Sequence, residues 1–118
     1  MVKHMGPSLD ATFAALADPT RRAILTRMGE ADPTLGVSVG DLAEPFDISL
    51  PAISKHLRVL ERAGLLKQQR DGRVRRCRLD PKPIAEAEEW ITFHKQFWDH
   101  QLDNLADFLE QSRDDPAT

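Results

Sequence analysis

Apolar residues recur with a helical period near the start of the chain. Ser8, a favourable N-cap residue, precedes a predicted helix over residues 9–16, in which apolar positions lie three and four apart. Asp18 followed by Pro19 is typical of an N-cap and the first position of a helix, and this pair predicts a second helix that continues to residue 28. The sequence therefore predicts two short helices at the start of the fold.

The next segment is rich in residues that interrupt helices. Residues 29–37 contain glycine and proline and predict a loop, with a short strand expected near residues 35–39. A short third helix is expected to begin at Ser38 or Val39 and to end near Pro45. This segment separates the first two helices from a longer one.

The longer helix, Leu50–Ala63, is predicted between a Ser49 cap and a Gly64 stop. The periodicity then changes from helical to alternating, which predicts strands over residues 65–70 and 73–79. A change of period directly after a helix indicates that a β-element follows it in the fold.

Asp71–Gly72 between the two strands is a strong signal for a β-hairpin. Asp80 can cap a last long helix, with Pro81 and Pro83 in its first turn, that continues to about Ser112. A short helix, a second helix and a hairpin in this order predict a mostly α fold with a small β-hairpin wing. This is the winged helix-turn-helix arrangement.

Charge is distributed unevenly, which changes the interpretation of a 118-residue chain whose net charge is −3. Residues 51–82 hold ten Lys and Arg against three Asp and Glu, whereas the segments on both sides are acidic. A basic block between acidic flanks predicts binding to a polyanion. The single cysteine, Cys77, and the lack of a secretory or membrane-spanning apolar run predict a cytoplasmic protein with no membrane partner.

The helix predicted over residues 50–63 has a core face and a basic face. Ile53, Leu57 and Leu60 form the inner stripe, and the outer face carries three cations and no acid. We expect Ser54 and Lys55 to reach bases, because the N-terminal end of such a helix enters the major groove. Pro51 and Ala52 are expected to make apolar contacts, and Arg58 and Arg62 to contact phosphates. His56 is equally explained as a DNA contact or as a residue at the boundary of the core. The predicted DNA contacts of this helix are Ser49, Pro51, Ala52, Ser54, Lys55, His56, Arg58 and Arg62.

The hairpin turn is also basic. A typical hairpin tip has balanced charge, so the four arginines around this one favour contact with the DNA backbone or minor groove. The predicted wing contacts are Arg70, Gly72, Arg73, Arg75 and Arg76. Strand alternation places Cys77 and Leu79 on one face, which we expect to point inward.

Three motifs in order resemble the ArsR family of bacterial repressors. DPTRRAIL at residues 18–25 resembles its second-helix signature, SLPAISKHL at 49–57 with LERAGL at 60–65 its recognition helix, and RDGR at 70–73 its wing. The resemblance covers nearly the whole chain. It implies a homodimer, packed through the first and last helices, that binds a pseudo-palindromic double-stranded DNA operator and represses transcription.

The metal-sensing members of this family differ from this chain at one motif. They carry Cys-x-Cys on the short third helix, where Ser38 and Gly40 stand here, so no metal or cofactor is expected at that position. One alternative is a metal-responsive repressor that uses His94, His100 and Asp103 on the last helix. Another is a redox-responsive repressor that uses Cys77, although a buried cysteine is usually a small hydrophobe.

The last predicted helix has an apolar face that one small domain cannot bury. This face predicts a dimer interface, with an aromatic ligand pocket as the alternative; the residues identify no small-molecule inducer. The predicted interface residues are Leu9, Phe13, Trp90, Ile91, His94, Phe97, Trp98, Leu102, Leu105 and Leu109.

Three classes of function compete for such a chain. We expect no enzyme, because there is no glycine-rich phosphate loop and Ser54 and His56, two apart on a helix, point in different directions. A winged-helix module that binds protein would not need so many basic residues in the recognition helix and wing. The sequence therefore predicts a DNA-binding transcriptional repressor, with one domain over residues 8–112 between a disordered or tag-derived segment 1–7 and a disordered tail 113–118.

Overall fold

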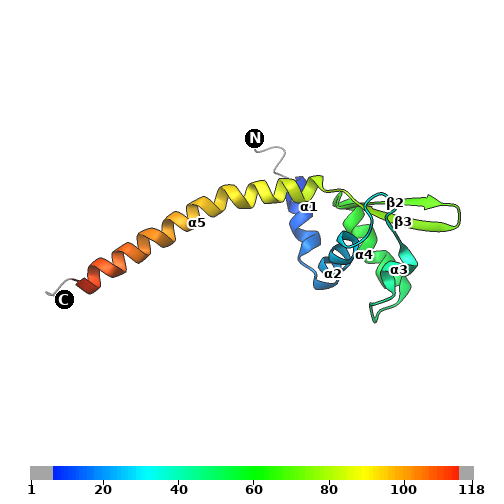
Figure 1. Cartoon of the computed structure of the whole chain (residues 1–118), viewed down its shortest axis with the longest axis horizontal. Coiled ribbons are helices and arrows are strands. Elements are labelled where there is room, and N and C mark those ends of the chain that lie inside the picture. The colour runs from blue at the N-terminus through cyan, green and yellow to red at the C-terminus, as the bar shows by residue number, and fades with distance from the viewer. Residues whose placement is uncertain (1–6, 115–118) are drawn as a thin grey trace. The chain divides into compact units, whose positions relative to one another are not determined.

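The computed structural model describes residues 7–114 of the chain (Figure 1). The elements are α1 (Pro7–Leu16), α2 (Pro19–Gly29), β1 (Val37–Ser38), α3 (Val39–Ala43), α4 (Leu50–Arg62), β2 (Leu66–Asp71), β3 (Val74–Leu79) and α5 (Lys82–Asp114). The predicted order of helices and hairpin, and the winged helix-turn-helix fold, are confirmed. The chain divides into two compact units, Met1–Ala87 and Glu88–Thr118, so that α5 begins in the first unit and continues through the second.

The ends of the chain differ slightly from the prediction. Helix α1 begins at Pro7, so Ser8 lies within the helix and does not precede it as a cap. Helix α5 continues two residues beyond Ser112, to Asp114. The remaining parts of the predicted disordered ends, residues 1–6 and 115–118, lie outside the described residues.

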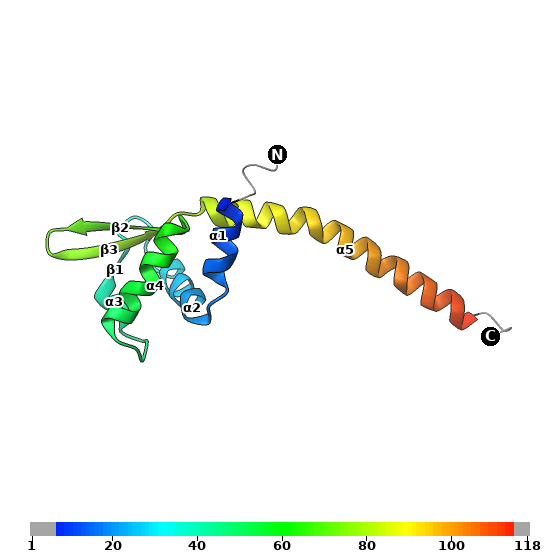
Figure 2. The same cartoon turned by 180° about the vertical axis from the view of Figure 1, so that it is seen from behind.

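The wing is a three-stranded antiparallel sheet in the order β1-β3-β2, visible in Figure 2. The predicted short strand is present: Val37 pairs with Cys77 on β3. In the hairpin, Asp71 pairs with Val74, so the turn residues are Gly72 and Arg73 and not the predicted Asp71 and Gly72. Gly72 has a φ of +66°, which a hairpin turn with glycine at its first central position requires.

The core lies where α2, α3 and α4 meet the sheet. The predicted stripe of α4 is confirmed, because Ile53, Leu57 and Leu60 have no exposed surface. Cys77 is buried as predicted, but Leu79 is 42% exposed. Leu79 is the last residue of β3, where the strand leaves the core, and it lines an apolar hollow of about 430 Å³ at the start of α5.

Three side chains cap helix starts, and the sequence predicted two of these caps, Asp18 and Ser49. Asp18 accepts a hydrogen bond from the backbone N–H of Arg21 at 3.0 Å. Ser38 and Ser49 play the same part at α3 and α4. Asp80, the predicted cap of α5, is not its N-cap, because the helix begins at Lys82, after Pro81, and Asp80 accepts from the N–H of Lys82 in the turn before it. Each cap provides a partner for a backbone donor that a helix start leaves unpaired, so these residues fix where each helix begins.

The part of α5 in the second unit carries a long apolar face. Residues Phe93, Phe97, Trp98, Leu102, Leu105, Phe108 and Leu109 are each more than half exposed within the single chain. Along the described residues, no helix combines the length and apolar character needed to cross a membrane. An apolar surface of this kind on a single helix normally packs against another protein surface.

Candidate nucleic-acid interface

The outward face of α4 is basic and open to solvent. Lys55, Arg58 and Arg62 are exposed, and they lie opposite the buried stripe of the same helix. Near the N-terminal end, Pro51 is exposed and Ala52 is half-buried. The side chains at this end are small, and the cations Arg58 and Arg62 lie further along the helix.

Polar contacts fix α4 to the elements around it. His56 Nδ1 lies 4.0 Å from Oδ2 of Asp18, the N-cap of α2, so this histidine is directed toward α2. Glu61 accepts two hydrogen bonds, both at 3.2 Å, from the backbone N–H and side-chain amide of Gln68 on β2. The sequence patterns gave no sign of the contact between Glu61 and Gln68, because it joins residues seven positions apart in different elements.

Two of the wing arginines are exposed and two are half-buried. Arg70 and Arg73 are exposed on either side of Gly72. Arg75 is half-buried and donates a hydrogen bond to Oγ of Ser54 on α4 at 3.1 Å. Arg76, also half-buried, pairs with Asp71 at 3.6 Å between Nε and Oδ2. The predicted set of wing contacts therefore divides into two exposed cations and two that are engaged within the fold.

A groove of about 420 Å³ joins the wing to the starts of α3 and α4. Arg70, Arg73 and Arg75 line its wing side, and Gly40 and Leu50 line its helix side, with no acidic residue among its lining residues. A positively charged concave surface attracts and orients a polyanion, because the field of several like charges adds within it. The groove carries the basic residues of the hairpin to the first residue of α4, Leu50.

The basic residues of the chain differ in what engages them. Before α4, Arg21 donates to the carbonyl of Ala15 at 2.7 Å, Arg22 to that of Leu16 at 2.8 Å, and Arg27 to that of Asp41 at 2.9 Å. Across the described chain, by contrast, no hydrogen bond or ion pair engages the cations of the α4 face and the hairpin tip: Lys55, Arg58, Arg62, Arg70 and Arg73. These five side chains remain available for an external anion.

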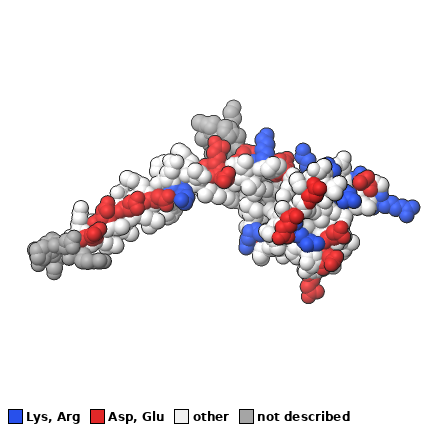
Figure 3. Space-filling model, in the orientation of Figure 1, with Lys and Arg blue, Asp and Glu red and all other residues white. Residues whose placement is uncertain are grey.

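The distribution of charge separates one basic region from acidic ones. Figure 3 shows Lys and Arg side chains at the free end of the hairpin, Asp and Glu side chains along α5, and side chains of both signs on the side of the winged unit that holds α2 and α3. The charge of the whole chain, −3, conceals this separation. Within the winged unit, a polyanion would be attracted to the free end of the hairpin.

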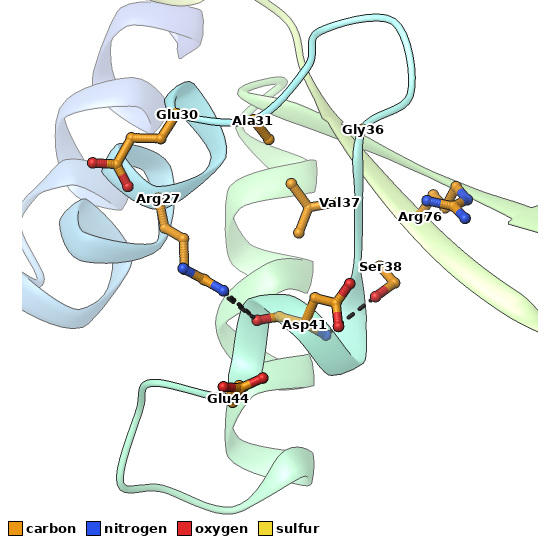
Figure 4. A pocket seen from close by; sticks show the side chains of 9 residues that line it. All are labelled: Arg27, Glu30, Ala31, Gly36, Val37, Ser38, Asp41, Glu44 and Arg76. Carbon is orange, nitrogen blue, oxygen red and sulfur yellow. Dashed lines mark hydrogen bonds between the residues drawn. The ribbon is translucent and has the colours of Figure 1, made fainter.

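A second, polar hollow of about 320 Å³ lies between the end of α2, α3 and β1 (Figure 4). Glu30, Asp41 and Glu44 line it together with Arg27 and Arg76. Its mixed charge makes it a poor site for phosphate. Over the described residues, no three His, Cys, Asp or Glu side chains come together as metal ligands.

Cys77 is enclosed by the core and has no exposed surface. Burial raises the pKa of its thiol to about 11, although the nearby Arg75 guanidinium acts in the opposite direction. A thiol with so high a pKa is almost entirely protonated at neutral pH, and the thiolate is the reactive form. This environment does not favour the redox alternative.

The predicted interface residues fall into three groups by exposure. Ile91, Phe97, Trp98, Leu102, Leu105 and Leu109 are exposed, and Trp90, His94 and Phe13 are half-buried. Leu9, in contrast, is only 6% exposed within the single chain, so it has little surface left for a partner. His94 donates from Nδ1 to the carbonyl of Trp90 at 2.9 Å and stacks on the Trp90 ring, which leaves only Nε2 for a metal ion.

Known proteins resemble this chain in sequence over most of its length. A family model described as a helix-turn-helix domain matches residues 16–69. The HTH-type transcriptional regulator Rv2034 of Mycobacterium tuberculosis is 36% identical over 108 residues, which cover 92% of this chain and 94% of that protein. The transcriptional repressor SdpR of Bacillus subtilis is 35% identical over 83 residues, 70% of this chain and 88% of the repressor.

Solved structures resemble it in fold. The ArsR family transcriptional regulator RHA00566 matches with a TM-score of 0.70 and 38% identity, over 78% of this chain and 91% of that one. An ArsR-like transcriptional regulator from Rhodococcus sp. RHA1 matches with a TM-score of 0.67 and 33% identity, over 86% of this chain and 92% of that one. Sequence and structure therefore agree on the same class of protein.

Proposed function

This chain belongs to the ArsR family of winged helix-turn-helix transcriptional regulators, and from this we propose that it represses transcription by binding a double-stranded operator as a homodimer. Its activity as a DNA-binding transcriptional regulator follows from the family. Repression, the homodimer, the contacts with DNA and a cytoplasmic location are the proposed parts. The observation that carries them is the set of exposed cations on α4 and at the hairpin tip, Lys55, Arg58, Arg62, Arg70 and Arg73, which no group among the described residues engages.

In the proposed complex, the N-terminal half of α4 lies in the major groove. Ser54 and Lys55 then face base edges, with Pro51 and Ala52 in apolar contact, while Arg58 and Arg62 meet phosphates. The exposed wing arginines, Arg70 and Arg73, reach the neighbouring phosphates of the DNA backbone. The short side chains at the start of α4 and the absence of acidic residues in the groove support this arrangement.

The homodimer is proposed from the exposed apolar face of α5. Seven large apolar side chains that remain more than half exposed on one helix are costly in water unless a partner covers them. A second copy of the same helix supplies a matching surface, because a two-fold interface pairs one patch with itself. Two copies of α4 then read two half-sites about 34 Å apart, which makes the operator pseudo-palindromic.

The DNA proposal is tested with operator fragments obtained by in vitro selection. The double substitution Lys55→Glu and Arg58→Glu should abolish binding at 100 mM salt while leaving the circular dichroism spectrum unchanged. Lys82→Glu is the matched control, because Lys82 follows β3 at the end of the sheet opposite the turn, and it should bind nearly as the unmodified chain does. Unchanged affinity in the folded double variant would contradict the proposed interface.

The dimer proposal needs a separate measurement. Trp98→Glu places a charge on the apolar face of α5, where Trp98 is 70% exposed, and should convert the dimer to a monomer in sedimentation velocity at micromolar concentration. Gln96→Glu adds the same charge two residues earlier, about 200° around the helix, and should leave the dimer intact. A Trp98→Glu variant that stays dimeric would place the interface elsewhere.

We propose no metal, cofactor or catalytic activity for this chain. Ser38 and Gly40 stand where the metal-sensing members of the family carry a thiolate pair, and the proposed contacts with DNA involve none of the three. Zn²⁺ at 10 μM should therefore leave operator affinity unchanged. A loss of affinity with Zn²⁺ that disappears in a His100→Ala variant would instead support the metal-responsive alternative, which uses His94, His100 and Asp103.

A further inference from the structure

One side-chain hydrogen bond joins the wing to the recognition helix. Arg75 Nη2 on β3 donates to Ser54 Oγ on α4 at 3.1 Å, between residues 21 positions apart in sequence. Both side chains are half-buried, and Arg75 also lines the basic groove between the wing and the helix starts. The contact lies at the edge of the surface that the proposed function assigns to DNA.

The chemistry of this pair fixes the role of the hydroxyl group. A guanidinium group has only hydrogen-bond donors, so the oxygen of Ser54 must be the acceptor. The hydroxyl hydrogen then points away from the positive charge. Within the described part of the chain no acceptor takes that hydrogen, so what Ser54 offers to a ligand is an O–H donor.

We propose that Arg75 is a positioning residue that presents Ser54 to DNA as a hydrogen-bond donor, so that Ser54 selects a base pair by an acceptor on its major-groove edge. The acceptors available there are N7 and O6 of guanine, N7 of adenine and O4 of thymine, whereas the exocyclic amino groups of adenine and cytosine are donors. The inference rests on the proposed function, because it requires α4 in the major groove. In this proposal Arg75 is not one of the wing arginines that contact phosphate.

Two readouts separate positioning from phosphate contact. A phosphate contact contributes about 0.9 to the slope of log affinity against log salt and is indifferent to sequence. A residue that orients a base-reading hydroxyl changes base preference and leaves the salt slope nearly unchanged. A contact that only stabilised the wing would change neither readout in a folded variant.

The experiment measures base preference at every operator position by competition binding, together with the salt slope. Ser54→Ala should lower discrimination about fivefold at one position in each half-site. Arg75→Gln should lower base discrimination at the same position. The double variant should lose no more discrimination than Ser54→Ala alone, because both substitutions disrupt the same Arg75–Ser54 pair. Ser54→Thr keeps the hydroxyl group and should keep the preference.

The matched control is Arg73→Gln, which removes an exposed arginine of the same hairpin. It should reduce the salt slope by about 0.9 and leave base preference unchanged. An Arg75→Gln variant that behaves like Arg73→Gln, or a Ser54→Ala variant with the original preference, would overturn the inference. If Arg75→Gln does not fold, the comparison of Ser54→Ala with Ser54→Thr decides the matter. An unmodified chain that selects no DNA sequence would refute the proposed function itself.

Discussion

The imidazole of His56 on α4 lies 4.0 Å from the carboxylate of Asp18, the residue that caps α2. Asp18 therefore has two partners: the backbone N–H of Arg21, which it accepts from, and the histidine, which pairs with it when protonated. The side chains are 24% and 32% exposed, so solvent screens their attraction. The cap is the stronger of the two contacts, because the hydrogen bond from Arg21 is the largest cause of the lowered pKa of Asp18 and the charge of His56 is a lesser one.

Substitutions of Asp18 separate these two contacts. Asp18→Asn keeps an oxygen for the N–H of Arg21 but loses the charge, whereas Asp18→Ala loses both. We expect the melting temperature at pH 7 to fall slightly for the first variant and by several degrees for the second, as followed by circular dichroism. Equal melting temperatures for the two variants would show that the charge, and not the cap, matters.

The pH dependence of the Asp18 contribution has a definite sign. The hydrogen bond from Arg21 is the main cause that holds the pKa of Asp18 below its ordinary value of 3.8. A carboxyl group with a lowered pKa stabilises the fold above its unfolded pKa, and this contribution is lost as the pH falls through the folded value. The difference in unfolding free energy between the original chain and Asp18→Ala should therefore shrink below about pH 4.

Gly36 precedes β1 in a conformation that other residues avoid. Its φ is +72°, and an added Cβ would lie 2.7 Å from the carbonyl oxygen of Cys77, a backbone atom that cannot move aside. Left-handed strain and the clash together predict that Gly36→Ala lowers the free energy of unfolding by about 2–4 kcal/mol. Chemical denaturation measures this change.

Gly29, at the end of α2, is the matched control for this substitution. A Cβ there would meet no atom within 4 Å, and its φ lies outside the left-handed region. Gly29→Ala should be neutral or stabilise the protein by up to about 1 kcal/mol, because alanine loses less backbone entropy in a helix. If the two substitutions had the same effect, the approach of Gly36 to β3 would not be a constraint on the fold.

The wing arginines should differ in their effect on DNA affinity. Arg73 is an exposed turn residue, so Arg73→Ala should reduce both the affinity and the salt slope, the latter by about 0.9. Arg76 is half-buried and paired with Asp71 at 3.6 Å, so Arg76→Ala should change the slope much less. Fluorescence anisotropy between 50 and 200 mM salt measures both. A larger slope change for Arg76→Ala than for Arg73→Ala would reverse this assignment.

Most of the fold could be predicted from the sequence because its signals are local. Caps such as Asp18 and Ser49 act within one helical turn, and the stripe of Ile53, Leu57 and Leu60 is a periodicity within one helix. The turn of the hairpin was misplaced by one residue, because Asp71 with Gly72 and Gly72 with Arg73 are both suitable turn pairs. Register depends on cross-strand pairing, which local patterns do not contain.

The candidate site was predicted as a set of residues but not as an arrangement. A count of basic residues gives Arg70, Arg73, Arg75 and Arg76 equal weight, whereas the structure engages the last two within the fold. Strand alternation placed Cys77 inside correctly and Leu79 incorrectly, because a strand end can leave the core while the alternation continues. Contacts between elements distant in sequence decide which side chains are free.

The buried Cys77 thiol should react slowly in the folded protein. Burial raises its pKa from an ordinary 9.0 to about 11, so at neutral pH the folded chain holds about 100-fold less thiolate than an unfolded one. Reaction with a thiol reagent such as dithionitrobenzoate should be at least that much slower in the native protein than in urea. The neutral thiol stabilises the fold below about pH 9, and this contribution is lost as the pH rises through about 11.

The same environment predicts the response of the protein to oxidant. Because the thiolate is scarce and the sulfur is fully enclosed, hydrogen peroxide at 1 mM should leave operator affinity unchanged over an hour. A Cys77→Ser variant treated in the same way controls for oxidation elsewhere, for example at Met28, which is 4% exposed. A loss of affinity in the original chain that the serine variant lacks would show that β3 opens to solvent, and it would favour the redox-responsive alternative. Because Cys77 pairs with Val37 across the sheet, such opening would also separate β1 from β3 and expose amides of both strands to hydrogen exchange.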